Sequence, residues 1–357
     1  IDWLNNYIFP LEQEFVSEEF VRIGTKLACW EMIRGGTTTF VDMYFYPEVI
    51  AEVASSCGLR ALVSSTVSDN ETPNAMNADD ALLNGQDFIE RWKNKNSLIT
   101  PILGPHAIYS VNLQQLQNTR KIANETNTPI SIHLSESQFE TQYSLTNYGM
   151  TSIKALESIN FFDGLTIAAH VVWPTDEEIL ILANNKVGVV HNPTSNMKLS
   201  SGIAPISKML EAGVLIGIGT DGAASNNDLD MWEEMRLAAL LQKVSTMNPE
   251  ALPAIEVLKM ATVNGAKIIG MDNAIGKIGI GMTADIIQIG YDDVHHLPSY
   301  DIASHLVYVT DEQDVINVII DGKLVMHEKE LLTIDTKEIE DDVLYFADKI
   351  KKSIENN

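Results

Sequence analysis

Short apolar runs alternate with longer amphipathic segments along most of the chain. The runs are rich in β-branched residues and cover residues 37–43, 59–67, 98–104, 129–134, 165–170, 187–191 and 215–219. The segments between them, such as 47–57, 175–184 and 203–212, have apolar positions at helical spacing. Strands that alternate with helices in this way form βαβ units. The pattern therefore predicts seven parallel strands in an α/β fold.

The region before the first run predicts helix instead of strand. Residues 1–34 have a helical pattern in which Ser17 is suited to cap a helix and Gly35 and Gly36 are suited to end it. A closed (β/α)8 barrel of the TIM type needs eight strands. We therefore expect a TIM-type barrel without strand 1, either because the chain begins after that strand of a longer protein or because the sheet is incomplete.

The pattern changes after two further expected helices, at 229–244 and 254–269. Short strand candidates follow at 279–282, 284–289, 304–309, 315–320 and 323–327, with a turn at Asp321 and Gly322. An amphipathic helix is expected over 336–357. The predicted organisation is a barrel over 1–274, a small appended β-sandwich domain over 275–335, and a C-terminal helix over 336–357.

Composition and charge restrict the class of protein. The 357 residues are 45% hydrophobic and 20% charged, which is enough apolar material for a large core. The net charge of −25 would repel nucleic acid and an anionic membrane surface, so neither is expected as a partner. The start of the chain lacks the features of a signal peptide, and a cytoplasmic location is expected. Cys29 and Cys57 occur in helical patterns and are expected to be buried apolar residues.

Polar side chains stand at the ends of five of the predicted strands. They are His106, His133, His170, His191 and Asp221. Taken singly, a histidine at such a position is more often a structural residue, and Asp221 could simply cap a turn. Catalytic groups of an α/β barrel, however, come from the C-terminal ends of several strands. The repeated placement predicts one active site built from these residues.

The residue types at these strand ends suit metal-assisted hydrolysis. Neutral imidazole and carboxylate, as in His133 and Asp221, are metal ligands, and a bound divalent ion makes water acidic enough to supply hydroxide near neutral pH. Asp221 can take the proton of that water. Glu136 can deliver protons to the substrate and to the departing amine, provided that the chain turns directly after His133. His106 can hold the substrate, and residues 191–196 can form a wall of the site.

Four segments resemble those of a known family. Residues 132–136, 168–170, 191–199 and 219–227 resemble the amidohydrolase superfamily, in its branch of 5-methylthioadenosine and S-adenosylhomocysteine deaminases. The resemblance implies a hydrolytic deaminase that releases ammonia from a purine nucleoside such as 5-methylthioadenosine, S-adenosylhomocysteine or adenosine. It also implies one divalent metal ion, zinc first and iron as the alternative.

The resemblance assigns roles to individual residues. His133 and Asp221 match metal ligands, Glu136 the proton shuttle, and His170 the residue that polarises the attacking water. Glu12 and His106 match positions that contact the substrate, as Glu136 and Asp221 also would. A small-molecule substrate and a homo-oligomer are expected.

The sequence departs from the family in two places. The family has a His-x-His metal pair at the end of its first strand, and no His-x-His occurs in this sequence. We therefore expect this chain alone to bind metal weakly. Family members that accept S-adenosylhomocysteine are expected to carry arginines after the third strand, whereas residues 65–90 contain neither arginine nor lysine. This departure favours a neutral nucleoside, 5-methylthioadenosine or adenosine.

Two alternative functions stay open on the sequence. One is another amidohydrolase activity, on a nucleobase or a triazine, of the guanine deaminase or chlorohydrolase type. The other is a catalytically silent scaffold of the same fold, which the absence of the His-x-His pair would explain.

Overall fold

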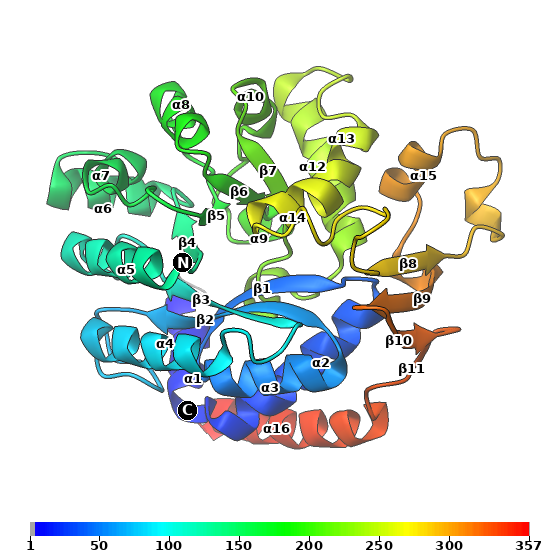
Figure 1. Ribbon diagram of the computed structural model, residues 1–357, viewed down its shortest axis with the longest axis horizontal. Coiled ribbons are helices and arrows are strands. Elements are labelled where there is room, and N and C mark those ends of the chain that lie inside the picture. Colours follow the sequence, from blue (N-terminus) through cyan, green and yellow to red (C-terminus); the bar gives the residue numbers. More distant parts are fainter. Residues whose placement is uncertain (1–3, 357) are drawn as a thin grey trace.

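A curled sheet of seven parallel strands dominates the computed structural model, which describes residues 4–356 (Figure 1). The strands follow the chain order, so that each is hydrogen-bonded to the next and β1 and β7 form the two edges. They are β1 (Thr39–Tyr44), β2 (Arg60–Val67), β3 (Ile99–Pro105), β4 (Ile130–Leu134), β5 (Thr166–His170), β6 (Gly188–His191) and β7 (Leu215–Ile218). All seven predicted strands are confirmed, with bounds within two residues of those expected.

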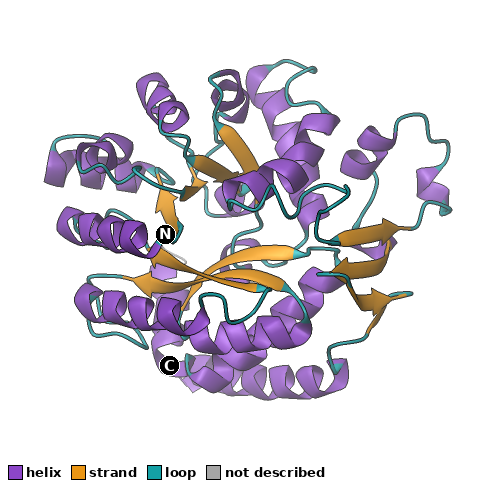
Figure 2. Ribbon diagram, in the orientation of Figure 1, coloured by secondary structure: helices purple, strands orange, loops and turns teal. Residues whose placement is uncertain are grey.

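Helices surround this sheet and connect its strands (Figure 2). They are α1 (Phe9–Phe15), α2 (Glu18–Arg34), α3 (Pro47–Cys57), α4 (Ala78–Trp92), α5 (Leu113–Thr126), α6 (Gln138–Tyr148), α7 (Ser152–Ser158), α8 (Asp176–Asn184), α9 (Pro193–Lys198), α10 (Ile206–Glu211), α11 (Ala223–Asn226), α12 (Met231–Thr246), α13 (Ala254–Lys259) and α14 (Gly265–Ile268). Two π-helical turns, Leu4–Ile8 and Met260–Asn264, precede α1 and join α13 to α14. The arrangement is that of a TIM-type barrel.

Local signals in the sequence explain where several helices begin and end. The hydroxyl of Ser17 accepts a hydrogen bond from the backbone N–H of Phe20 (3.2 Å), so the predicted helix over 1–34 is divided and α2 starts after Ser17. Residues 1–3 of that prediction lie outside the described residues. Gly58 ends α3 at φ 81°, a backbone conformation that glycine adopts without strain.

The interior of the barrel is packed with branched side chains. Leu62, Ile102 and Ile167 from β2, β3 and β5 form a cluster that is closed by Ile268 of α14. Ile268 can approach β6 because Gly188 has no side chain, and a Cβ there would lie 2.7 Å from it. Cys29 and Cys57 are both buried, as predicted, and both are free thiols. The interior of the barrel is therefore filled by side chains, so we expect a functional site at one end of the barrel.

The appended region forms one antiparallel sheet of four strands. They are β8 (Ile286–Ile289), β9 (Val315–Ile320), β10 (Lys323–His327) and β11 (Glu330–Leu331), in the order β11-β10-β9-β8. The described residues thus supply one sheet of the expected β-sandwich domain. The strands expected at 284–289, 315–320 and 323–327 are confirmed.

Two of the strand predictions for this region are wrong. Residues 304–308 belong to helix α15 (Ile302–Tyr308), and Val309 follows its end, because the side chain of Asp301 caps the backbone N–H of Ser304 (2.9 Å) and buried Val307 lies at helical spacing from Ala303. Residues 279–282 form a turn closed by a hydrogen bond from the N–H of Met282 to the carbonyl of Gly279 (3.2 Å).

The last helix, α16 (Thr336–Asn356), returns to the barrel and packs on α2 (Figure 1). Phe346 of α16 meets Phe20 of α2 edge to face, with ring centroids 5.6 Å apart. The predicted C-terminal helix is confirmed, and its last residue, Asn357, lies outside the described residues. The domain boundaries at 274 and 335 stay a prediction. No helix among residues 4–356 combines the length and the apolar character needed to cross a membrane.

A buried ion pair joins the barrel to the appended sheet. Arg60 at the start of β2 binds both carboxylate oxygens of Asp285, from Nε (2.9 Å) and from Nη2 (3.1 Å), and both side chains are buried. We predict that Arg60→Ala lowers the free energy of unfolding by about 3 kcal/mol, because it leaves a buried carboxylate without its partner. Urea unfolding measures this effect. Arg22→Ala removes the exposed Arg22–Glu52 pair and serves as control, with an expected loss of less than about 1 kcal/mol.

Candidate active site

Three side chains from separate strands meet at the C-terminal edge of the barrel. His133 lies in β4, His170 ends β5, and Asp221 follows β7. One ligand atom of each lies within 4.8 Å of those of the other two. Residues that are 37 or more positions apart in the sequence are thus brought together, as the strand-end pattern predicts.

Hydrogen bonds fix which nitrogen of each histidine faces the other groups. Nδ1 of His133 donates to the backbone carbonyl of His106 (2.9 Å), and Nδ1 of His170 donates to the side-chain oxygen of Asn196 (2.9 Å). Because the Nδ1 atoms carry the protons, each Nε2 keeps a lone pair in the neutral ring. The two rings stack with centroids 5.5 Å apart. His133 and His170 can therefore both offer Nε2 to a metal ion or to a water molecule.

Asp221 is oriented by two donors and by its own backbone. The hydroxyl of Ser195 donates to Oδ2 (2.7 Å), and the N–H of Gly222 donates to Oδ1 (2.8 Å). Asp221 has φ 62°, in the left-handed region that costs a residue with a side chain some strain. The carboxylate is therefore held toward the cluster by contacts that outweigh an unfavourable backbone.

The charges of these groups reinforce one another. Burial alone lowers the pKa of His170, but the neighbouring charges of Glu136 and Asp221 outweigh it and raise that pKa above its ordinary value. Burial alone raises the pKa of Asp221, but His170 and His133 outweigh it and lower that pKa. The edge of the barrel therefore favours a carboxylate that stays ionised beside imidazoles.

Glu136 reaches this cluster because the chain turns immediately after β4. Ser135 has φ 51°, and the turn brings Oε2 of Glu136 to 4.0 Å from Nε2 of His170. The other oxygen of Glu136 accepts a hydrogen bond from the hydroxyl of Ser201 (3.3 Å). The turn is stabilised by buried Glu140, which accepts the N–H groups of Ser135 (2.7 Å) and Glu136 (3.0 Å). The turn expected from the sequence is thus present.

His106 joins the cluster, His191 lies close to His170, and Glu12 contacts Tyr44. The ring centroid of His106 is 5.0 Å from that of His133, and burial lowers its pKa to about 3, so the ring is neutral. Glu12 accepts a hydrogen bond from Tyr44 (2.6 Å), the last residue of β1, and not from any of the clustered residues. Burial also lowers the pKa of His191 to about 3, and its ring nitrogens have no hydrogen-bond partner among residues 4–356.

Sequence reasoning missed the residues that orient the clustered side chains. Ser195 and Asn196 belong to the polar segment after β6, which was expected only to form a wall. Ser201 and Glu140 carried no signal, because a glutamate in the first turn of a helix is ordinarily exposed. A search for polar residues near each strand end would have found the first two.

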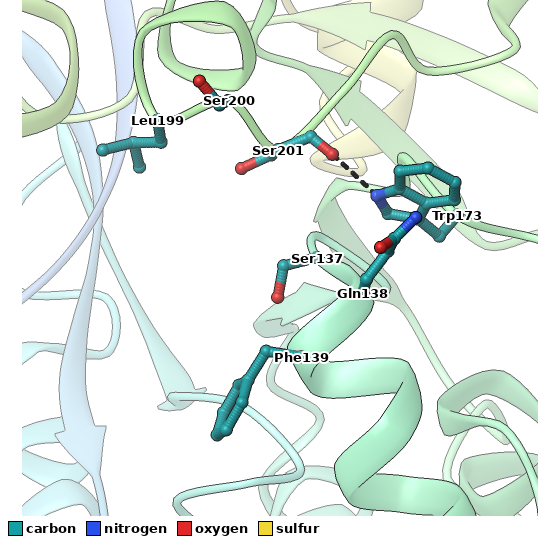
Figure 3. Close-up of a pocket in the computed structure, with 7 residues that line it drawn as sticks. All are labelled: Ser137, Gln138, Phe139, Trp173, Leu199, Ser200 and Ser201. Carbon is teal, nitrogen blue, oxygen red and sulfur yellow. Dashed lines mark hydrogen bonds between the residues drawn. The ribbon is translucent and has the colours of Figure 1, made fainter. Parts of the chain in front are cut away.

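A pocket opens between the start of α6, Trp173 and the segment after α9 (Figure 3). Its volume is about 370 Å³, and it is lined by Ser137, Gln138, Phe139, Trp173, Leu199, Ser200 and Ser201. Its wall is fixed by a hydrogen bond from the indole N–H of Trp173 to the carbonyl of Ser201 (2.7 Å). Since the hydroxyl of Ser201 donates a hydrogen bond to Glu136, the pocket adjoins Glu136, and the seven residues that line it are all uncharged.

Glu140 makes stability depend on pH. Burial raises the pKa of Glu140 from 4.5 in the unfolded chain to about 7. Between these values the folded chain keeps a proton that the unfolded chain has lost, so stability falls as the pH rises from about 4.5 to 7. In the original protein this fall in the free energy of unfolding is expected to be on the order of 3 kcal/mol, and we predict that it is absent from Glu140→Gln. Urea unfolding at pH 5 and pH 7.5 measures this difference, and Glu157→Gln, a change to an exposed residue, is the control. If the free energy of unfolding of Glu140→Gln falls between these two pH values as much as that of the original protein, the prediction is wrong.

The chain belongs to the amidohydrolase family, which it matches over residues 2–325. It is 43% identical over 351 residues to a 5-methylthioadenosine/S-adenosylhomocysteine deaminase of Thermodesulfovibrio yellowstonii, an alignment that covers 98% of this chain and 80% of that protein. A 5′-deoxyadenosine deaminase of Methanosarcina barkeri is 42% identical over 352 residues, with the same coverage. Among solved structures, an adenosine deaminase from Xanthomonas campestris with bound zinc has a TM-score of 0.96 and 35% identity, covering 98% of this chain and 80% of that one.

Proposed function

We propose that this chain is a metal-dependent hydrolytic deaminase that releases ammonia from a neutral purine nucleoside, such as 5-methylthioadenosine or adenosine. The observation that carries the proposal is the convergence of His133, His170 and Asp221 within 4.8 Å, with Glu136 4.0 Å from His170. The names of the deaminases that resemble this chain over 98% of its length support the same reaction.

The donor atoms of the cluster fit a divalent metal ion. His133 offers Nε2 because its Nδ1 is bonded to the carbonyl of His106, and Asp221 offers carboxylate oxygens. Imidazole and carboxylate together suit zinc, and iron accepts the same ligands. We propose one zinc ion held by His133 and Asp221. The ion would lower the pKa of water and so supply hydroxide at neutral pH.

The side chains account for the movement of each proton. Water attacks the ring carbon that bears the amino group, and Asp221 takes the water proton because its lowered pKa keeps it ionised. His170 holds that water through Nε2, since its Nδ1 is bonded to Asn196. Glu136 carries the proton taken by Asp221 on to the ring nitrogen, and it then carries the proton of the newly added hydroxyl to the amine. The oxygen of the water becomes a carbonyl, and Asp221 and Glu136 return to their starting states. A carbon–oxygen bond forms, the carbon–nitrogen bond breaks, and ammonia leaves.

The pocket beside Glu136 supports the choice of a neutral substrate. Phe139 and Trp173 present aromatic surface for a flat ring, and the serines around them offer hydroxyl groups. No basic side chain lines the pocket, so a substrate carboxylate would lose solvation there without gaining a partner. His106 and Glu12 are proposed to contact the sugar end of the substrate.

A substrate panel tests the proposal. Ammonia release by the metal-loaded protein is measured with 5-methylthioadenosine, adenosine, S-adenosylhomocysteine, guanine and a chlorinated triazine. We expect the two neutral nucleosides to give the highest kcat/KM. Faster turnover of guanine or of the triazine would replace the proposal by another amidohydrolase activity, and no turnover of any of them would favour the silent scaffold. A cytoplasmic location and a homo-oligomer stay predictions.

A further inference from the structure

A second group of metal-ligating side chains lies in the appended region, outside the proposed active site. His295 and His296 occupy the short 3₁₀ turn Val294–His296 between β8 and α15, and Asp314 directly precedes β9. Nε2 of His295 lies 3.0 Å, and Nε2 of His296 3.3 Å, from the same oxygen of Asp314. One ligand atom of each residue lies within 4.8 Å of those of the other two. In Figure 1 the segment between β8 and α15 lies at the right edge of the molecule, away from β4 and β5.

Hydrogen bonding explains His295 but leaves His296 without a partner. Nε2 of His295 faces both oxygens of Asp314, at 3.0 and 3.1 Å. The side chain of His296 is 0% exposed, and among residues 4–356 neither of its ring nitrogens has a hydrogen-bond partner, although Asp314 is near. Buried polar groups are nearly always bonded, so this ring calls for a ligand. A cation between the two Nε2 atoms and the carboxylate would take the lone pair of His296 and the negative charge of Asp314 together.

The three side chains are held in place before any ion binds. The ring of His296 stacks on Tyr291, with centroids 4.4 Å apart and an interplanar angle of 25°, and lies 6.1 Å from the ring of His305. Asp314 accepts a hydrogen bond from the N–H of Asp311 (3.0 Å), which orients its carboxylate. Ligands that are fixed by their surroundings lose little freedom when they bind a metal.

We propose that His295, His296 and Asp314 form a second metal site, which takes a zinc-class divalent ion. Two imidazoles and one carboxylate are ligands that zinc prefers, whereas magnesium and calcium prefer oxygen ligands alone. The His295 side chain is 36% exposed, so the ion can enter from solvent and keep a water molecule as its fourth ligand. The ion ties the connection between β8 and α15 to the start of β9 and acts as a structural link. This site does not depend on the proposed deaminase activity.

The test compares zinc bound by matched variants of the full chain, measured by equilibrium dialysis and elemental analysis. We expect His295→Ala to bind one zinc ion fewer per chain than the original protein, or to bind it more than about tenfold more weakly. The control is His327→Ala, which removes another exposed histidine of the appended region, one that lies in β10 and bonds Asn317. It should bind as much zinc as the original protein. Any zinc bound by His133, His170 and Asp221 is the same in every variant, so it does not affect the difference in zinc content between them.

Two further measurements keep a folding defect apart from a lost ligand. With a chelator present, His295→Ala should have the same melting temperature as the original protein. Added zinc should raise the melting temperature of the original protein more than that of His295→Ala. Asp314→Asn keeps an oxygen for the N–H of Asp311 but loses the charge, and it should also lose the ion. Equal zinc binding by the original protein, His295→Ala and Asp314→Asn would overturn the proposal. Deaminase turnover should be unchanged in His295→Ala.

Discussion

Replacing Glu136 by glutamine should lower kcat for nucleoside deamination by about 10²- to 10⁴-fold, with little change in KM. Glutamine has the shape of glutamate and can still accept a hydrogen bond from Ser201, which lies 3.3 Å from Glu136. It cannot carry a proton to the ring nitrogen or to the amine. The loss therefore falls on the chemical step and not on substrate binding.

Steady-state kinetics and metal content of the same preparation check this expectation. Glu125→Gln, a change to an exposed residue of α5, is the matched control and should leave kcat unchanged. Metal content should be equal in the two variants, because Glu136 is not a proposed ligand. If Glu136→Gln keeps more than a tenth of the kcat of the original protein, Glu136 is not the proton carrier.

The barrel strands could be predicted because each is a short apolar run that is bounded by helical segments. Buried parallel strands leave this signal whatever their neighbours are. The errors fall where the signal is local and short. Residues 304–309 contain enough β-branched and aromatic side chains to indicate a strand, yet the cap at Asp301 and the burial of Val307 at helical spacing from Ala303 make residues 304–308 helical. Such short segments depend on tertiary packing more than on composition.

The clustered residues of the site could also be predicted, because parallel strands bring their C-terminal ends to one edge. His133, His170 and Asp221 needed only this rule. The residues that orient them did not follow from it, since Asn196 bonds His170 across 26 positions and Ser195 bonds Asp221 across the same separation. These contacts depend on how the loop after β6 folds over the edge, which no periodicity in the sequence encodes.

The second large effect is expected for Asp221→Asn, which should reduce kcat by about 10³-fold or more and weaken metal binding as well. The amide oxygen of asparagine can keep the hydrogen bond from the N–H of Gly222, and its NH2 group can donate to the hydroxyl of Ser195 in place of the bond that Asp221 accepts from it. The strained backbone and the side-chain position should therefore persist. What it loses is the negative charge, which both binds the ion and takes the water proton. Asp341→Asn, an exposed change on α16, is the control.

Comparison with Ser195→Ala separates the two roles of Asp221. Removing the hydroxyl leaves the charge but frees the carboxylate to turn, so a loss of about 10- to 100-fold is expected. Metal content and kcat are measured for each variant over a range of zinc concentrations. If saturating zinc restores the full kcat of Asp221→Asn, the carboxylate acts only as a ligand. If kcat stays low at full metal occupancy, Asp221 also acts as the base, which is the outcome that the proposed mechanism leads us to expect.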